Sequence, residues 1–133
     1  MEQYVTFETA QLLEKRRYDD IDLSTWYVQE GHRVELKRFE HYNLGYYRKK
    51  KGYVIYPCPT QALAIRWLRE KHNKYIDFIT TDNGNKGLSW QYEIVEGTTP
   101  FKVYIEASRK TEYPTYEECA EQAIKYCLEN ILK

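Results

Sequence analysis

Apolar residues recur with the period of an α-helix in three segments of the chain. The strongest patterns cover residues 59–73 and 115–132, and a shorter one runs from Thr6 to about Arg17. Thr115, with Glu118 three residues later, forms a capping-box pattern that favours a helix start. The two long apolar stripes comprise Leu63, Ala64, Ile65, Trp67 and Leu68, and Ala120, Ala123, Ile124, Cys127, Leu128 and Ile131. These patterns predict three amphipathic helices.

Between the two long helical segments, apolar and polar residues alternate with the period of a β-strand. Residues 75–81 are rich in β-forming residues, and Leu88 to Val95 alternates cleanly. A further strand is expected around Val103, Ile105 and Ala107. The second half of the chain therefore has the predicted order α-β-β-β-α, with both helices covering the apolar face of a three-stranded antiparallel sheet.

The first half is less regular. Residues 26–30 and 33–39 are predicted as two strands around Gly31 and His32. The segment Tyr46–Tyr56 is either a strand pair with a basic turn near Gly52 or a loop that leads into one strand. We expect these strands at an edge of the main sheet, which gives a single two-layer α+β domain over residues 1–133.

Composition narrows the functional classes. The 133 residues include 20 basic and 20 acidic residues, so a strong general attraction to nucleic acid or membranes is not expected. No apolar run reaches the roughly 20 residues that span a bilayer, and no secretory signal is visible, so we expect a cytoplasmic protein without a membrane association. Tyrosine is unusually frequent, with 14 residues, which suits half-buried strand faces and binding surfaces.

The α-β-β-β-α order of residues 59–132 resembles the double-stranded-RNA-binding domain. In that family the final helix opens with a lysine cluster that contacts phosphates. The matching stretch in this sequence is Tyr116-Glu117-Glu118-Cys119-Ala120, whose carboxylates would repel phosphate. The resemblance therefore implies the architecture and argues against the family's function.

Three segments carry a second resemblance: VTFETAQLL near the start, PTQALAIRWLREKH in the middle and YPTYEECAEQAIKYCLENI near the end. They are similar to a group of small uncharacterised proteins encoded by bacteriophages and prophages. The resemblance implies an intracellular accessory protein of phage type and supplies no catalytic residues.

Residues suited to catalysis are few and scattered. The three histidines, His32, His41 and His72, have no partner at a metal-ligand spacing, so no metal site and no cofactor are expected. Cys58, between two prolines, is better explained as a structural thiol than as a nucleophile. Glu117 and Glu121 lie one helical turn apart and are expected on the solvated side of the last helix. An enzymatic function, such as a small thiol enzyme or hydrolase, is therefore not favoured.

The best candidate site is the segment YYRKKKGYVIY. Its consecutive cations can neutralise phosphates, and its tyrosines offer rings on which unpaired bases stack. Two arginines on the outer side of the central helix are candidates to extend this site. The candidate nucleic-acid-binding residues are Tyr46, Tyr47, Arg48, Lys49, Lys50, Lys51, Tyr53, Arg66 and Arg69. A lysine-rich solvated turn that protects a sheet edge explains the same residues and is preferred from the sequence alone.

The sequence therefore favours a small non-enzymatic accessory or protein-binding domain whose main partner is another protein. Weak nucleic-acid binding through residues 46–53 is the alternative. A homodimer formed through an edge strand is compatible with the pattern, although nothing in the sequence requires it.

Overall fold

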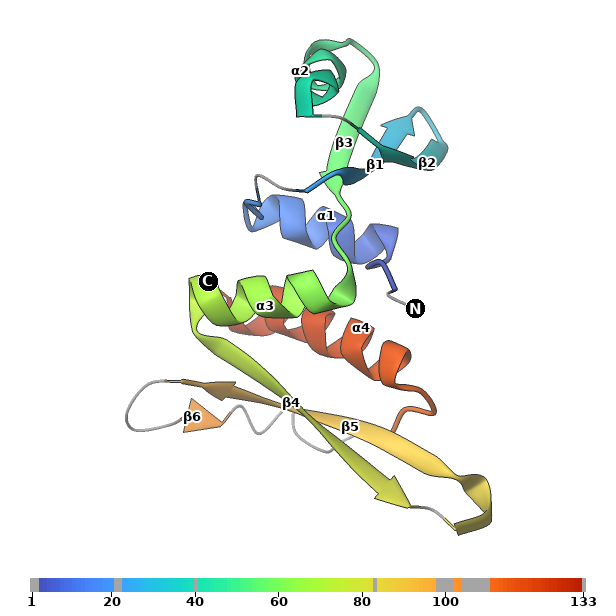
Figure 1. The fold of residues 1–133 in the computed structure, drawn as a ribbon, viewed down its shortest axis with the longest axis vertical. Helices are drawn as coiled ribbons and strands as arrows, with labels where there is room; N and C mark the ends of the chain where they lie inside the picture. The colour runs from blue at the N-terminus through green and yellow to red at the C-terminus, as the bar shows by residue number, and fades with distance from the viewer. Residues whose placement is uncertain are drawn as a thin grey trace. The chain divides into compact units, whose positions relative to one another are not determined.

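The computed structural model describes residues 3–20, 23–39, 41–82, 84–97, 102–103 and 111–132. By its internal contacts the chain divides into two compact units, each with its own sheet (Figure 1). We call Tyr4–Thr60 the front unit; the rear unit comprises Met1–Gln3 and Gln61–Lys133. The α+β class expected from the sequence is confirmed. That residues 1–133 form a single domain stays a prediction.

The front unit contains two helices and a three-stranded antiparallel sheet. Its elements are α1 (Phe7–Lys15), β1 (Thr25–Glu30), β2 (Arg33–Arg38), α2 (His41–Lys49) and β3 (Tyr53–Pro57). The strand order is β2-β1-β3. The expected placement of these strands at an edge of the main sheet is wrong, because β1 pairs with β2 on one side and with β3 on the other.

The two faces of the front sheet have different coverings. On one face Trp26, Val28 and Ile55 form a buried cluster with Phe39. Tyr47, from α2, packs against this cluster, so we call this side the α2 face. On the opposite face, Phe7 of α1 contacts the rings of Tyr27 and Tyr56 edge-on, with centroids 5.5 and 5.3 Å apart. Because successive side chains of a strand point to opposite faces, the two sets of residues pack separately and give the front unit a core of its own.

Helix α1 begins where the sequence predicts it. The hydroxyl of Thr6 accepts a hydrogen bond from the main-chain N–H of Thr9 at 3.3 Å, which caps the first turn. Ala10 and Leu13 are fully buried, and Lys15 lies in the last turn, where a cation complements the helix dipole.

The rear unit has the predicted α-β-β-β-α order. It contains α3 (Gln61–His72), β4 (Lys74–Asp82), the short helix η1 (Gly84–Lys86), β5 (Leu88–Glu96), β6 (Lys102–Val103) and α4 (Tyr116–Tyr126), which continues as the π-helical turn η3 (Cys127–Ile131). The antiparallel order is β4-β5-β6. Of the residues expected in the third strand, Val103 lies in β6, whereas Ile105 and Ala107 lie outside the described residues.

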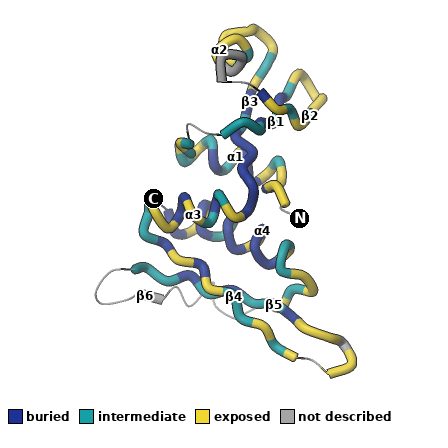
Figure 2. Tube along the Cα trace, viewed as in Figure 1, coloured by how far each residue is buried: buried dark blue, intermediate teal, exposed yellow. Residues whose placement is uncertain are grey.

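Both rear helices lie on the same side of the β4–β5 hairpin (Figure 1). The predicted apolar stripe of α4 and η3 is entirely buried, and Thr115 caps α4 by accepting from the N–H of Glu118 at 3.1 Å. Figure 2 shows buried stretches along α3 and α4, whereas the tip of the hairpin is exposed. Ile94 and Tyr92 of β5 complete this core, which confirms the expected alternation in the second part of the strand. At its start the expectation is wrong, because Leu88 is 55% exposed and Ser89 is buried.

One carboxylate expected in solvent is buried instead. Glu121 has only 6% of its surface exposed, and the side-chain amide of Gln61 donates to its Oε1 at 3.2 Å. The same amide donates to the carbonyl oxygen of Glu117 at 2.9 Å. The interpretation of Glu121 as a solvated residue is wrong, because α3 covers this side of α4.

Gly97 follows β5 and lies directly beside the ring of Tyr75. A Cβ atom built there would lie 2.3 Å from Cε2 of Tyr75 and 2.9 Å from Oδ1 of Asn73. The Tyr75 ring thus packs directly on the Gly97 backbone, and a larger residue here would have to displace this partly exposed ring. None of the described helices is long and apolar enough to span a membrane.

Candidate nucleic-acid interface

The basic and aromatic segment is built differently from either structure expected for it. Tyr46 to Lys49 form the last turn of α2, residues 50–52 make a turn, and Tyr53 begins β3. Gly52 adopts φ of 95°, a left-handed conformation that favours glycine. The strand pair and the simple loop are therefore both wrong for residues 46–49. The periodicity here is weak, and packing of Tyr47 on Phe39 supports the helix.

The three tyrosines of the segment have unequal access to solvent. Tyr47 stacks on Phe39, with ring centroids 4.6 Å apart, and meets Tyr53 edge-on at 5.6 Å. It belongs to the core of the front unit and is not a free platform for a base. Tyr46 is 59% exposed, the largest value among the exposed large hydrophobic residues of the described chain. Tyr46 is therefore the ring that the structure offers to a ligand.

Two of the four consecutive cations are positioned by aromatic rings. The guanidinium of Arg48 lies 5.3 Å from the centroid of the Trp26 ring. The ammonium of Lys50 lies 5.3 Å from the Tyr46 ring and 4.8 Å from the Tyr53 ring. A hydrogen bond to Tyr46 and attraction to the two phenols raise the pKa of Lys50 above its ordinary value. Lys49 and Lys51 are exposed.

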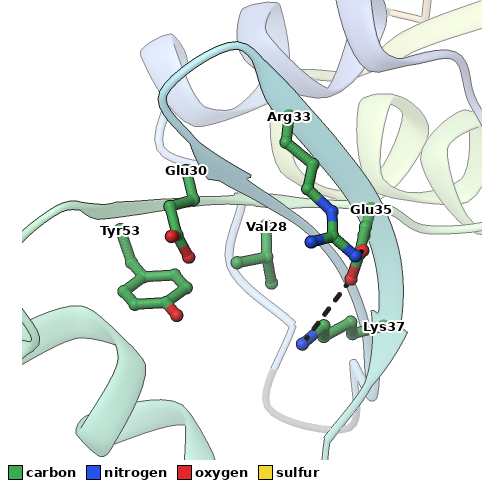
Figure 3. Close-up of a pocket in the computed structure, with 6 residues that line it drawn as sticks. All are labelled: Val28, Glu30, Arg33, Glu35, Lys37 and Tyr53. Atoms are coloured by element: carbon green, nitrogen blue, oxygen red, sulfur yellow. Dashed lines mark ion pairs between the residues drawn. The ribbon is translucent and has the colours of Figure 1, made fainter.

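A polar pocket of about 130 Å³ lies on the same α2 face. Figure 3 shows Val28 at its centre, with Tyr53 and Glu30 on one side. Arg33, Glu35 and Lys37, alternate residues of β2, form the other side. The pocket therefore has an apolar floor and charged walls.

Hydrogen bonds and ion pairs order these walls. Tyr53 donates to the Glu30 carboxylate, and this hydrogen bond, with burial, raises the pKa of Tyr53. Glu35 pairs with Arg33 and, at 3.7 Å, with the ammonium of Lys37. Lys37 also lies 5.6 Å from the centroid of the Tyr47 ring. The pocket is thereby joined to the basic segment through shared residues.

The charged side chains of the basic segment and the pocket are mainly positive. The carboxylates are Glu30 and Glu35. The cations are Arg33, Lys37, Arg48, Lys49, Lys50 and Lys51. Six cations accompany two carboxylates, so this surface has a positive excess that the neutral total of the chain conceals.

Sequence reasoning found one part of this site and missed the other. It identified residues 46–51 and Tyr53, but not Glu30, Arg33, Glu35 and Lys37. The alternation of charged residues at positions 33, 35 and 37 was the available signal, because period two places them on one strand face. Arg66 and Arg69 are exposed on α3 in the rear unit, so the front unit forms its site without them.

The residues considered for enzymatic chemistry are mostly buried. Cys58 is fully buried, and its Sγ donates to the carbonyl oxygen of Val5 at 3.7 Å. Burial also raises the pKa of Cys119 to about 11. His72 packs edge-on against Trp67 at 4.6 Å. Within the described part of the chain, no cluster of three or more His, Cys, Asp or Glu side chains is arranged to hold a metal ion.

No protein family model, no curated protein and no solved structure matches the chain. The resemblances to double-stranded-RNA-binding domains and to phage-encoded proteins therefore stay predictions from the sequence.

Proposed function

We propose that the front unit binds single-stranded nucleic acid on its α2 face. The observation that carries this proposal is the exposed Tyr46 ring next to four consecutive cations. Stacking on an aromatic ring and neutralisation of phosphates are the two interactions by which proteins hold unpaired strands without reading their sequence. Both are supplied within one helical turn and the turn that follows it.

Each residue of the segment has a distinct part in this proposal. Tyr46 offers its ring to one base, while Lys49 and Lys51 contact flanking phosphates. Arg48 and Lys50 are positioned by the aromatic rings beneath them. Their side chains therefore lose less conformational entropy on binding than side chains without such contacts. Arg33 and Lys37 extend the positive surface along β2.

A structural role explains only part of the same arrangement. Arg48 and Lys49 lie in the last turn of α2, where cations complement the helix dipole. Lys50 and Lys51 lie beyond the helix, and the dipole does not account for the exposure of Tyr46. The Tyr46 ring meets Tyr47 edge-on, with centroids 5.3 Å apart, yet 59% of the Tyr46 surface stays exposed.

Unpaired strands fit this surface better than duplexes. A base stacks on a protein ring only when it is free of its own helical stack. The rear unit has the element order of a duplex-RNA-binding domain, but Glu117 and Glu118 open its last helix. Their negative charges oppose contact with a phosphate backbone.

The test is a fluorescence-anisotropy titration of the full chain with labelled single-stranded DNA and RNA and with matched duplexes. The Tyr46→Ala variant should weaken single-strand binding by on the order of tenfold or more, because stacking contributes about 1–3 kcal/mol per base. Tyr4→Ala is the matched control, since Tyr4 is also exposed, at 42%, in the same unit. It should bind as the unaltered protein does.

Undetectable binding by the unaltered protein would refute the proposal. Equal affinity of the Tyr46→Ala variant would remove the stacking role, and a clear preference for duplex would overturn the assignment to single strands. Circular dichroism of each variant establishes that the fold is retained.

A further inference from the structure

Strand β2 forms an outer edge of the front sheet, since the order is β2-β1-β3. In an antiparallel pair, every second residue directs its main-chain N–H and C=O groups away from the partner strand. Among the described residues, no strand pairs with the outer side of β2. An edge of this kind is a template for a further strand.

The face opposite α2 carries an exposed aliphatic patch, with Val34 and Leu36 on β2 and Val54 on β3, at the other edge of the sheet. Val34, Leu36 and Val54 expose 36, 47 and 50% of their surface. The register places Val34 and Val54 on either side of Gln29, and Leu36 beside Tyr27. A strand added along β2 would cover part of Val34 and Leu36.

The charges of β2 do not protect this patch. Proteins often guard an edge strand by placing charged residues where a second strand would bring apolar ones together. Here Arg33, Glu35 and Lys37 all lie on the α2 face, and on the aliphatic face Arg38 is the charged residue of β2. The distribution instead separates an apolar row from a charged row.

The charged row is complementary to a copy of itself in the register that pairs residues 34–38 of β2. When two β2 strands run antiparallel around a two-fold axis at Leu36, each Glu35 faces Lys37 of the second copy, which makes two opposite-charge pairs. Leu36 then faces its own copy on the aliphatic face, and Val34 faces the apolar stem of Arg38.

Neighbouring registers are less favourable. An axis at Glu35 sets the two carboxylates against each other and places Arg33 opposite Lys37 of the second copy, so every facing pair of the charged row has like charges. An axis between two residues would join the aliphatic face of one copy to the charged face of the other, because a shift of one residue exchanges the faces. An axis at Val34 also pairs opposite charges, Arg33 with Glu35, but it matches only residues 33–35 of β2, whereas the axis at Leu36 matches residues 34–38. Charge, burial and the length of strand that is paired together favour the register centred on Leu36.

We propose that two copies of this chain associate through β2, antiparallel and centred on Leu36, to form one continuous six-stranded sheet. Glu35 is already paired with Arg33 and Lys37 in its own strand. These are exposed pairs that contribute little, so redirecting Glu35 across the interface sacrifices little. A contact of one short strand is small, and the dimer is expected to be weak, with a dissociation constant on the order of micromolar to tens of micromolar.

Charge exchange across the register provides the test. Glu35→Lys alone places lysine opposite Lys37 in both halves of the dimer, and Lys37→Glu alone does the same with carboxylates. Each variant should dimerise about tenfold more weakly than the unaltered chain, since two facing pairs become repulsive. An equimolar mixture of the two variants should recover dimers, because every facing pair is then of opposite charge.

The measurement is sedimentation equilibrium of the full chain, without nucleic acid, at concentrations up to about 100 µM. Leu36→Asp should also dissociate the dimer. Leu88→Asp is the control for this variant, because Leu88 is also an exposed leucine on a β-strand but belongs to the rear unit, where 55% of its surface is exposed. Monomers at every concentration of the unaltered chain would refute the proposal, and a mixture that stays monomeric while the unaltered chain dimerises would refute the register. Neither outcome bears on strand binding through Tyr46, which is measured separately.

Discussion

Replacing Lys49 and Lys51 together with serine tests how the α2 face contacts phosphates. All four consecutive cations are exposed, but Arg48 and Lys50 also lie over aromatic rings that support the local structure. The double variant should therefore retain its fold and lose binding. We expect the loss to be electrostatic and to appear as a smaller salt dependence.

The magnitude follows from the number of phosphates neutralised. For single strands, the logarithm of the association constant falls with the logarithm of the salt concentration with a slope of about −0.7 per phosphate contact. Four contacts, from Arg48 to Lys51, reduce affinity by about 50-fold between 50 and 200 mM salt. Two remaining contacts reduce it by only about sevenfold over the same interval.

The assay is anisotropy of a labelled oligothymidylate titrated at several salt concentrations. A double variant with the same change in charge, Lys15→Ser with Arg17→Ser, is the control. Lys15 is the last residue of α1 and Arg17 follows in the next turn, and α1 covers the other face of the sheet. It should keep the original slope. The same slope in the Lys49 and Lys51 variant as in the unaltered protein would refute the phosphate contacts assigned to these residues.

Three further outcomes concern the rear unit. Gly97→Ala should reduce the free energy of unfolding by about 1–3 kcal/mol, because the alanine Cβ would lie 2.3 Å from the Tyr75 ring. Urea titration measures this loss, and adding Tyr75→Ala should recover part of it. Gln61→Ala removes the amide donor to the buried Glu121 and should lower the free energy of unfolding by about 1–3 kcal/mol in the same assay. A change below about 0.5 kcal/mol would contradict the role of this hydrogen bond. Burial raises the pKa of Cys119 to about 11 from the ordinary 9.0, so the unfolded chain loses this proton first as pH rises. The contribution of Cys119 to stability should thus be constant below about pH 9 and decline from there to about pH 11; a thermal-melting series in which Cys119→Ala shows the same alkaline decline would contradict this.

The sequence predicted the rear unit well because its signals are local. The capping residue Thr115 and the stripe through Ala120 and Ile124 lie within a few helical turns, where periodicity reports burial directly. The alternation in β5 similarly identified Tyr92 and Ile94 as inward-facing. Glu121 was assigned wrongly because its partner, Gln61, is distant in sequence.

The front unit depended more on contacts between distant residues. Its strands were expected from the sequence. The alternation of apolar and polar residues indicates which side chains share a face of a strand, but it does not indicate which strands pair with one another. Helix α2 has a weak helical pattern, and the contact of Tyr47 with Phe39 was not visible in the sequence. The pocket likewise arises only when β2 folds beside β1 and brings Lys37 level with Trp26.

The use of aromatic rings to position Arg48 and Lys50 has a consequence for acidic surroundings. A carboxylate that holds a cation neutralises it and releases it on protonation, whereas the rings of Trp26, Tyr46 and Tyr53 neither cancel the charge nor change it in acid. The arrangement of these cations should thus persist from neutral pH to well below the range in which carboxylates titrate.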